Sequence, residues 1–354
     1  MKHFSKNVTN IKMNKEMKII DGSQGEGGGQ ILRTTLALSM CTGTPVRIEN
    51  IRAGRRKSGL LRQHLACVLA SKKICNAKVT GDELGSATVE FRPGDIKSGT
   101  YDFAIGSAGS TSLLFQTVLP ALLMADTEST VSFSGGTHND LAPSFDFIKH
   151  CFIPALKTIN LDVNAELHAY GFMPNGGGKW TAIIQPINGM GIFDMTSVGK
   201  FEIKQAIVTQ SGVSRSVAER ELARVKKKLQ WSDDDLHVNQ VESIGPGNII
   251  SLRVSDGNIS EVIDVVGAKK LSAERVAGRA ITAMKRYINS GAAVGEYLCD
   301  QLLLPLALGN GGRFTTIKPS LHTKTNIEVI KTFIDCDINI VETNDDLFEV
   351  SIQN

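Results

Sequence analysis

A repeated helix pattern restricts the possible folds of this chain of 354 residues more than any other sequence feature does. Two long apolar segments each carry a glutamine followed four residues later by a proline, namely Gln116 with Pro120 and Gln301 with Pro305. Proline inside a helix removes a backbone hydrogen bond, so two prolines at matching places are harder to obtain by chance than two apolar stretches. A third apolar segment carries Arg33 at the matching place. The sequence predicts three related helices, within residues 27–43, 109–125 and 295–309.

The surroundings of these helices repeat as well. Short strand-like runs precede the first two helices and follow all three. A polar loop and a second helix come next in each case, expected at 60–74, 143–159 and 324–334. Two strands close the last unit, at 338–343 and 347–352. Each unit therefore has the order β-α-β-α-β-β, and we expect an α+β fold with helices covering a sheet in every unit.

The spacing between the units indicates an inserted domain. Arg33 and Gln116 are 83 residues apart, whereas Gln116 and Gln301 are 185 residues apart. The excess falls in a segment with strands and helices of its own, one of them with a capping box at Ser216 and Glu219. A separate domain following in sequence is the alternative, but the strand-like residues 179–187 close the second unit before this segment. The expected boundaries are a tail at 1–16, units at 17–100, 101–187 and 188–196 with 289–354, and an insert at 197–288.

Composition and charge exclude several classes of protein. Lys and Arg number 39 against 36 Asp and Glu, and the net charge of +3 excludes a histone-like nucleic-acid binder. The six cysteines form no C-x-x-C pair, so neither a zinc knuckle nor a redox pair is expected. No apolar run approaches the ~18 residues that a membrane span needs, and the basic tail lacks the apolar core of a secretory signal. We expect a cytoplasmic protein with no membrane partner and a flexible tail.

The stretch DGSQGEGGGQILR, from Asp21 to Arg33, is the strongest local signal for a binding site. A strand-like run enters a glycine-rich loop and a helix follows, so backbone N–H groups at the helix start can hold an anion. Glu26 would repel a bare phosphate but can hold a divalent metal that bridges phosphates, and Arg33 can reach a phosphate. The alternative is a tight strand–helix turn with a solvated Glu26.

The loop from Ile51 to His64 carries five cations and no acid: Arg52, Arg55, Arg56, Lys57 and Arg62. It lies between a strand and a helix, and guanidinium groups match phosphate oxygens. A solvated basic face is the alternative, but the interleaved glycines and the helix start favour contact with RNA or nucleotide phosphates. Whether Gln63 and His64 face the same pocket or the helix surface stays open.

His322 lies in a polar loop at the place in its unit that the basic loop holds in the first. It can act as a nucleophile toward phosphorus, a base or a ligand, although a lone histidine more often has no chemical role. The rival is His138, in the matching loop of the second unit. Four polar neighbours are expected to cap the following helix and to hydrogen-bond the imidazole: Ser320, Thr323, Thr325 and Asn326.

Tyr297, Asp300 and Gln301 are spaced i, i+3 and i+4, so they share one face of an otherwise apolar helix. Polar groups on such a helix imply either buried hydrogen bonds or a pocket. A tyrosine ring that stacks on a base, with acid and amide groups to bond the sugar or base, is typical of a nucleotide pocket.

Taken together, these motifs resemble the RNA 3'-terminal phosphate cyclase family, in its histidine-containing catalytic branch. The resemblance extends from Met17 to the C-terminus, and the glycine-rich and basic loops described above are its first two motifs. Four more follow in order: residues 106–122, SGGTHNDLAP, AVGEYLCDQLLLP and PSLHTKTN. The resemblance implies three units similar to the C-terminal domain of a translation initiation factor, plus a small thioredoxin-like insert without a redox role.

The resemblance also implies a reaction. Such enzymes are ligase-type nucleotidyltransferases (EC 6.5.1.4) that use ATP and a divalent metal, Mg or Mn, to convert an RNA 3'-phosphate into a 2',3'-cyclic phosphodiester. A histidine takes AMP from ATP, releasing pyrophosphate, and passes it to the RNA 3'-phosphate; the neighbouring 2'-OH then expels AMP. His322 matches the adenylylated histidine and Glu26 the metal-binding glutamate. The implied nucleotide-binding residues are Arg33, Arg52, Arg55, Gln63, Gln116, Pro143, Tyr297, Leu298, Cys299, Asp300 and Gln301.

Two alternatives to this function are considered. One is a non-catalytic member of the family that binds RNA in ribosome biogenesis, but such homologues lack the histidine that this chain keeps as His322. The other is an enolpyruvyl-type transferase, which has a similar repeat architecture. The expected partners are ATP and RNA with a 3'-phosphate end, and association into a homodimer is left open.

Overall fold

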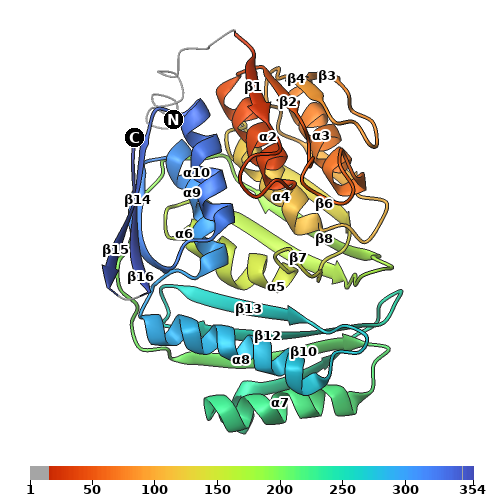
Figure 1. Ribbon diagram of the computed structural model, residues 1–354, viewed down its shortest axis with the longest axis vertical. Helices are drawn as coiled ribbons and strands as arrows, with labels where there is room; N and C mark the ends of the chain where they lie inside the picture. Colours follow the sequence, from red (N-terminus) through yellow and green to blue (C-terminus); the bar gives the residue numbers. More distant parts are fainter. Residues whose placement is uncertain (1–15, 345) are drawn as a thin grey trace.

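The computed structural model describes residues 16–344 and 346–354, and over these ranges the strands form four separate four-stranded sheets (Figure 1). In three of the sheets the strands pair in the same way. The first strand of the unit lies parallel to the second, the second lies antiparallel to the fourth, and the fourth lies antiparallel to the third. The predicted β-α-β-α-β-β order therefore occurs three times. Residues 1–15 of the predicted tail lie outside the described residues.

The units have the following elements. The first comprises β1 (Lys18–Asp21), α2 (Gln30–Thr42), β2 (Val46–Glu49), α3 (Arg62–Cys75), β3 (Lys78–Thr80) and β4 (Val89–Arg92). The second comprises β5 (Thr100–Ala104), α4 (Thr111–Leu123), β6 (Ser129–Gly135), α5 (Phe145–Phe147), the π-helical turn η1 (Ile148–Phe152), α6 (Ile153–Lys157), β7 (Val163–Ala169) and β8 (Gly178–Ile184). The third comprises β9 (Phe193–Met195), α9 (Glu296–Leu308), β14 (Gly312–Ile317), α10 (Leu321–Phe333), β15 (Asp337–Asn344) and β16 (Leu347–Gln353).

The three predicted apolar helices form the centre of the molecule. Helix α4 packs against both α2 and α9, and α10 packs against α2 and α9. Most side chains of α2, α4 and α9 are buried, because each helix lies between its own sheet and a neighbouring helix. Pro120 and Pro305 lie inside α4 and α9, as predicted. One continuous hydrophobic core joins all three units.

The fourth sheet lies between β9 and α9 in the sequence. It comprises β10 (Ile203–Ser211), α7 (Arg215–Leu229), the 3-10 turn η2 (Asp233–Asp235), β11 (Leu236–Gln240), β12 (Gly247–Ser255), β13 (Ser260–Val266) and α8 (Ala273–Ser290). The strand order is β11-β10-β12-β13, and α7 and α8 pack beside the sheet over a second, separate core (Figure 1). We call this segment the inserted unit; its likeness to thioredoxin stays a prediction.

One local expectation was wrong. The first helix of the inserted unit begins at Arg215 with Ser214 as its N-cap, so Ser216 lies inside the first turn. The Ser216 hydroxyl lies 2.9 Å from that of Ser214, and Glu219 pairs with Arg215 at 3.2 Å. A serine two residues earlier, with extended backbone, takes the cap position.

In the described part of the chain, no helix is both long and apolar enough to cross a membrane.

Candidate active site

His322 lies in the first turn of α10 and is held by a residue from the first unit. The Nδ1 atom of its imidazole lies 2.6 Å from Oε1 of Gln30, the first residue of α2, although the two residues are 292 positions apart in the sequence. Ser320 caps α10 as expected, because its hydroxyl accepts a hydrogen bond from the Thr323 N–H at 3.2 Å. The expectation that polar neighbours in the same loop bind the imidazole was wrong, since packing of α10 on α2 brings Gln30 to it instead.

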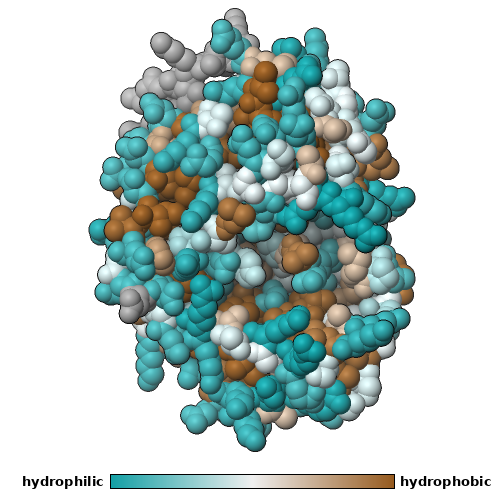
Figure 2. All heavy atoms as spheres, viewed as in Figure 1, coloured by the Kyte–Doolittle hydropathy of each residue, from teal (hydrophilic) through white to brown (hydrophobic). Residues whose placement is uncertain are grey.

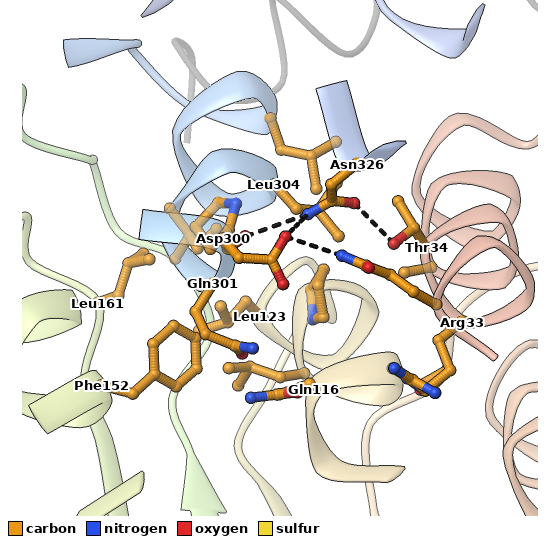
Figure 3. Close-up of a pocket in the computed structure, with 18 of the residues that line it drawn as sticks. Arg33, Thr34, Gln116, Leu123, Phe152, Leu161, Asp300, Gln301, Leu304 and Asn326 are labelled. Atoms are coloured by element: carbon orange, nitrogen blue, oxygen red, sulfur yellow. Dashed lines mark hydrogen bonds between the residues drawn. The ribbon is translucent and has the colours of Figure 1, made fainter. Parts of the chain in front are cut away.

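Gln30 belongs to a chain of hydrogen bonds that crosses three helices. Its Nε2 donates to Oδ1 of Asp300 at 2.8 Å, and Nδ2 of Asn326 donates to the same oxygen at 3.1 Å. The hydroxyl of Thr34 donates to Oδ1 of Asn326 at 2.8 Å (Figure 3). An ionised carboxylate only accepts, so the Gln30 amide turns its oxygen toward His322. Nδ1 of His322 therefore carries the proton and Nε2 keeps its lone pair.

Asp300 is the acceptor on which this arrangement depends. Burial raises the pKa of its carboxyl, while the nearby His322 and the hydrogen bond from Gln30 oppose the rise. Because the pKa is raised, acidification protonates Asp300 at a higher pH than an exposed aspartate. A protonated Asp300 accepts the Gln30 hydrogen bond more weakly, so we expect the imidazole to be held less firmly at low pH.

A cavity of about 740 Å³, partly open to solvent, lies between α2, α4 and α9 (Figure 3). Its polar side includes Arg33, Gln116 and Gln301, and its far side is apolar, with Leu123 and Phe152 among its lining. Within the described residues, Nε2 of Gln116 has no hydrogen-bond partner, and Figure 3 draws no hydrogen bond from the Arg33 guanidinium to the other residues shown. Burial lowers the pKa of Arg33. A buried cation beside an unpaired amide donor fits an anionic ligand.

The glycine-rich loop before α2 packs against α10, which carries His322. The N–H of Glu26 donates to Oγ1 of Thr325 at 3.1 Å. A side chain at Gly25 would collide with that hydroxyl, and the backbone of Gly25 has φ +55, so the close approach requires glycine. Helix α2 has no side-chain cap at Gly29, which leaves the N–H groups of its first turn available to an anion.

Glu26 is already engaged by protein groups. One of its carboxylate oxygens accepts a hydrogen bond from the Gly28 N–H at 2.8 Å, and the other pairs with the Arg55 guanidinium. Over the described ranges, no three His, Cys, Asp or Glu side chains lie close enough to hold a metal ion. A divalent metal at Glu26 would have one protein carboxylate and would take its other ligands from phosphate and water, as Mg²⁺ commonly does. The residues therefore fit a metal only when a polyphosphate supplies further ligands to the ion and pairs with Arg55 in place of Glu26.

Two residues of the basic loop, Arg52 and Gln63, make structural contacts. The Arg52 guanidinium donates to the backbone oxygens of Lys57 and Gly59, at 2.5 and 3.1 Å, so it holds its own loop in shape. Oε1 of Gln63 accepts a hydrogen bond from the Ser110 N–H at 2.8 Å and thereby joins the first unit to the start of α4. Neither residue lines the cavity between the helices.

His64, which the sequence left open, faces the glycine-rich loop. It is buried, and a side chain at Gly29 would collide with its Nε2. Its Nδ1 accepts a hydrogen bond from the Leu61 N–H at 3.3 Å, so Nε2 carries the proton. Burial, with the positive charges of Arg33 and Arg52, lowers its pKa to about 3 and keeps the ring neutral.

The structure divides the predicted residues of α9 between two faces. Asp300 and Gln301 line the cavity, whereas Tyr297 is 60% exposed near the helix start. Leu298 and Cys299 are buried in the core, and burial raises the pKa of the Cys299 thiol to about 12. Since successive helical residues are turned by about 100°, these two side chains point away from the cavity, and the structure does not bring them to the site. Pro143 precedes α5 and does not line the cavity either.

The inserted unit contacts two segments that flank the site. The Glu261 carboxylate of β13 accepts a hydrogen bond from the N–H of Gly295, the N-cap of α9, at 3.1 Å. Asp264 of the same strand accepts a hydrogen bond from the Ser144 hydroxyl, the N-cap of α5, at 2.6 Å. Burial raises the pKa of Glu261 to about 8 and that of Asp264 to about 6.

Comparison with known proteins identifies the family. A family model described as RTC: RNA 3'-terminal phosphate cyclase matches residues 24–340. The chain belongs to this family. Among solved structures, the enolpyruvyl transferase NikO from Streptomyces tendae is similar at 11% sequence identity with a TM-score of 0.38, over 95% of this chain and 48% of that one. This chain thus spans about half the length of that protein, and a likeness at this level decides nothing about fold or function.

The match to the RNA 3'-terminal phosphate cyclase family includes every site residue named above, from Glu26 to His322. Sequence reasoning overlooked Gln30 and Thr34 as parts of this site and left the place of His64 open. Gln30 and Thr34 are polar residues at i and i+4 on an apolar helix, with Arg33 beside them. The same spacing rule that singled out Tyr297, Asp300 and Gln301 would have found them.

His138, the rival histidine, is a structural residue. It is fully buried, its Nδ1 lies 2.8 Å from the Thr137 hydroxyl, and its ring packs against Tyr170 and Phe172. Nε2 lies 3.3 Å from the Asp146 carboxylate. Both ring nitrogens are engaged and no atom reaches solvent, so His138 has no free lone pair to offer a substrate.

Proposed function

We propose that this protein is an RNA 3'-phosphate cyclase that uses ATP to form a 2',3'-cyclic phosphodiester through an AMP adduct on His322. The observation that carries the proposal is the hydrogen-bond chain through Gln30 and Asp300 that leaves Nε2 of His322 unprotonated. Family membership supplies the RNA 3'-phosphate as the substrate class.

The first step is attack of His322 Nε2 on the α-phosphorus of ATP. An N–P bond forms, the bond to the bridging oxygen breaks, and pyrophosphate leaves. The proton on Nδ1 stays with the imidazole, and the Oε1 atom of Gln30 stabilises the positive charge that the ring gains. Nε2 needs no separate base in this step, because its lone pair is free in the tautomer that Gln30 selects.

The surrounding groups suit the charge of a triphosphate. Arg33 presents its guanidinium and Gln116 an unpaired donor in the cavity, and the first turn of α2 presents N–H groups. Glu26 would hold a divalent metal together with the phosphates; such an ion neutralises the charge on the departing pyrophosphate. Arg55, released from Glu26, would then pair with phosphate oxygens.

Two further steps complete the reaction. A 3'-phosphate oxygen of the RNA attacks the phosphorus held on Nε2, which breaks the N–P bond and restores the free imidazole. The RNA phosphate now carries AMP as a leaving group. The vicinal 2'-OH loses its proton and attacks that phosphate, the 2'-O–P bond forms, and AMP departs. The step needs the 2'-OH, so it is specific to RNA ends.

The test uses two end-labelled oligoribonucleotides that differ only in the terminal sugar, one with a 2'-OH and one 2'-deoxy, both with a 3'-phosphate. With ATP and Mg²⁺, both substrates are expected to become resistant to phosphatase, the 2'-OH substrate as the cyclic phosphate and the 2'-deoxy substrate as the adenylylated end, which is heavier by one AMP. His322→Ala abolishes both products, and His168→Ala, at an exposed histidine bonded to Thr181, retains them. Full phosphatase sensitivity with the folded wild-type protein would overturn the proposal.

A further inference from the structure

The charges of the chain are divided unequally between its parts. Residues 197–288 contain 15 Lys and Arg against 11 Asp and Glu, whereas residues 17–196 with 289–354 contain 20 against 24. Three of the 11 acids, Glu221, Glu261 and Asp264, have pKa values that burial raises. The inserted unit is therefore the positive part of a molecule whose larger part is negative at neutral pH. A polyanion is attracted to the former and repelled by the latter.

The positive charge gathers in a groove at one end of the inserted unit. There the C-terminal ends of α7 and α8 meet the segment that leads into β10, and the groove has a volume of about 1130 Å³. Its charged lining residues are Lys200, Lys204, Lys228 and Lys285, and no acid lines it. All four lysines are exposed, and among the described residues none of them forms an ion pair. Solvated lysines often end helices, but here three different elements aim them into one concave surface.

A second basic hollow adjoins the groove and extends it along α7. It is lined by Arg220, Arg224, Lys227 and Lys228, so the two concave surfaces share Lys228. The one acid in this lining, Glu274, is paired with Arg220 at 3.2 Å. Figure 2 shows mainly hydrophilic side chains over α7 at the lower end of the molecule. The positive surface thus continues from the groove along α7.

We propose that this groove binds the phosphodiester backbone of the RNA substrate upstream of its 3'-terminal phosphate. The proposal rests on the proposed function, which makes RNA the substrate. The active site needs only the terminal nucleotide, and the remaining phosphates of a longer strand require positive charge elsewhere. Flexible lysines suit a backbone read without regard to sequence, because each acts as a point charge on a phosphate.

Equilibrium binding tests the groove without any catalytic step. We would measure the fluorescence anisotropy of a labelled single-stranded RNA of about 20 nucleotides with the full-length protein, without ATP, at several salt concentrations. The double variant Lys204→Glu/Lys285→Glu is expected to bind about tenfold more weakly, with a smaller salt dependence, since fewer counterions are released. The milder variant Lys204→Gln/Lys285→Gln should also weaken binding, and it checks that the loss does not come from misfolding caused by charge reversal. The matched control Lys78→Glu/Lys269→Glu changes the total charge equally and should leave binding unchanged.

Kinetics with a long and a short substrate then distinguish an effect on the groove from an effect on the active site. The groove variants should raise the KM for the long 3'-phosphate RNA about tenfold, leave the KM for a trinucleotide unchanged, and form the AMP adduct at the wild-type rate. Equal binding of the long RNA by wild-type and groove variants would overturn the proposal. An equal loss of RNA binding in the control variant would also overturn it. So would binding of a polyglutamate of similar length that is as tight as the binding of RNA. Absence of an AMP adduct in every variant would refute the proposed function instead, and the anisotropy result would still decide the groove.

Discussion

At the scale of single residues, the candidate site depends on contacts between distant parts of the chain. His322 could be singled out from its polar loop, but its pairing with Gln30 could not, because the two are 292 residues apart and only the packing of α10 on α2 joins them. Glu26 was found from its place among glycines, whereas its pairing with Arg55 required the fold of two loops. Residue type and loop position could thus be predicted, and the hydrogen-bond geometry could not.

Gln30→Ala tests the role of Gln30 as a positioning residue. Without Oε1 of Gln30, the proton of His322 is free to occupy either nitrogen and the ring is free to rotate, so adduct formation at saturating ATP should fall about 10- to 100-fold. The KM for ATP should change little, because Gln30 holds the nucleophile rather than the nucleotide. Rates of incorporation of α-labelled ATP measure both quantities.

Gln24→Ala is the control for that experiment, since Gln24 is an exposed glutamine of the neighbouring loop. A Gln30→Ala protein that forms the adduct at the wild-type rate would show that the hydrogen bond to Nδ1 does not set the tautomer.

At the scale of elements, the inserted unit supports the start of α9. The N-cap of α9 is Gly295, and its own backbone N–H donates to the Glu261 carboxylate of β13 at 3.1 Å. Sequence patterns predicted the helices and strands on both sides of this contact. They could not predict the contact itself, because Glu261 resembles an ordinary polar residue at the start of a strand until the fold buries it.

This contact gives the stability of the protein a pH dependence. Burial raises the pKa of the Glu261 carboxyl from 4.5 to about 8 in the folded protein. Between these values the folded state holds a proton that the unfolded chain has released, so the free energy of unfolding falls as pH rises through this window. The slope from one such proton is at most about 1.4 kcal/mol per pH unit. Cys151 of η1 and Asp264 of β13 face Glu261, and Asp264 adds a smaller effect at lower pH.

Glu261→Gln keeps an acceptor oxygen for the Gly295 N–H and removes the titration. Urea unfolding of the full-length protein at several pH values between about 5 and 8 should show a shallower slope in this variant than in the wild type. Glu202→Gln, at an exposed glutamate of the same unit, should keep the wild-type slope. Identical slopes for Glu261→Gln and the wild type would contradict the account.

At the scale of the whole molecule, the fold is a repeat with one interruption. The repeat was visible in the sequence because all three units keep a buried helix, and proline recurs at one place in two of them. The three sheets of the repeat share one strand order. The site is not part of any one unit: Gln30 and Arg33 come from the first, Gln116 from the second, and Asp300 and His322 from the third. A single unit would not form the site. The residues of the site could therefore be predicted from motifs within each unit, but their assembly across the three units could not.

The central claim is that Nε2 of His322 takes AMP from ATP. The most direct test is intact-mass analysis of the full-length protein after incubation with ATP and Mg²⁺, followed by peptide mapping under neutral conditions, because phosphoramidate bonds are cleaved by acid. The account predicts a mass increase of one AMP, located on the peptide that contains His322 and absent from His322→Ala but not from His168→Ala. An unmodified wild-type protein, or an AMP adduct on any other residue, would contradict it.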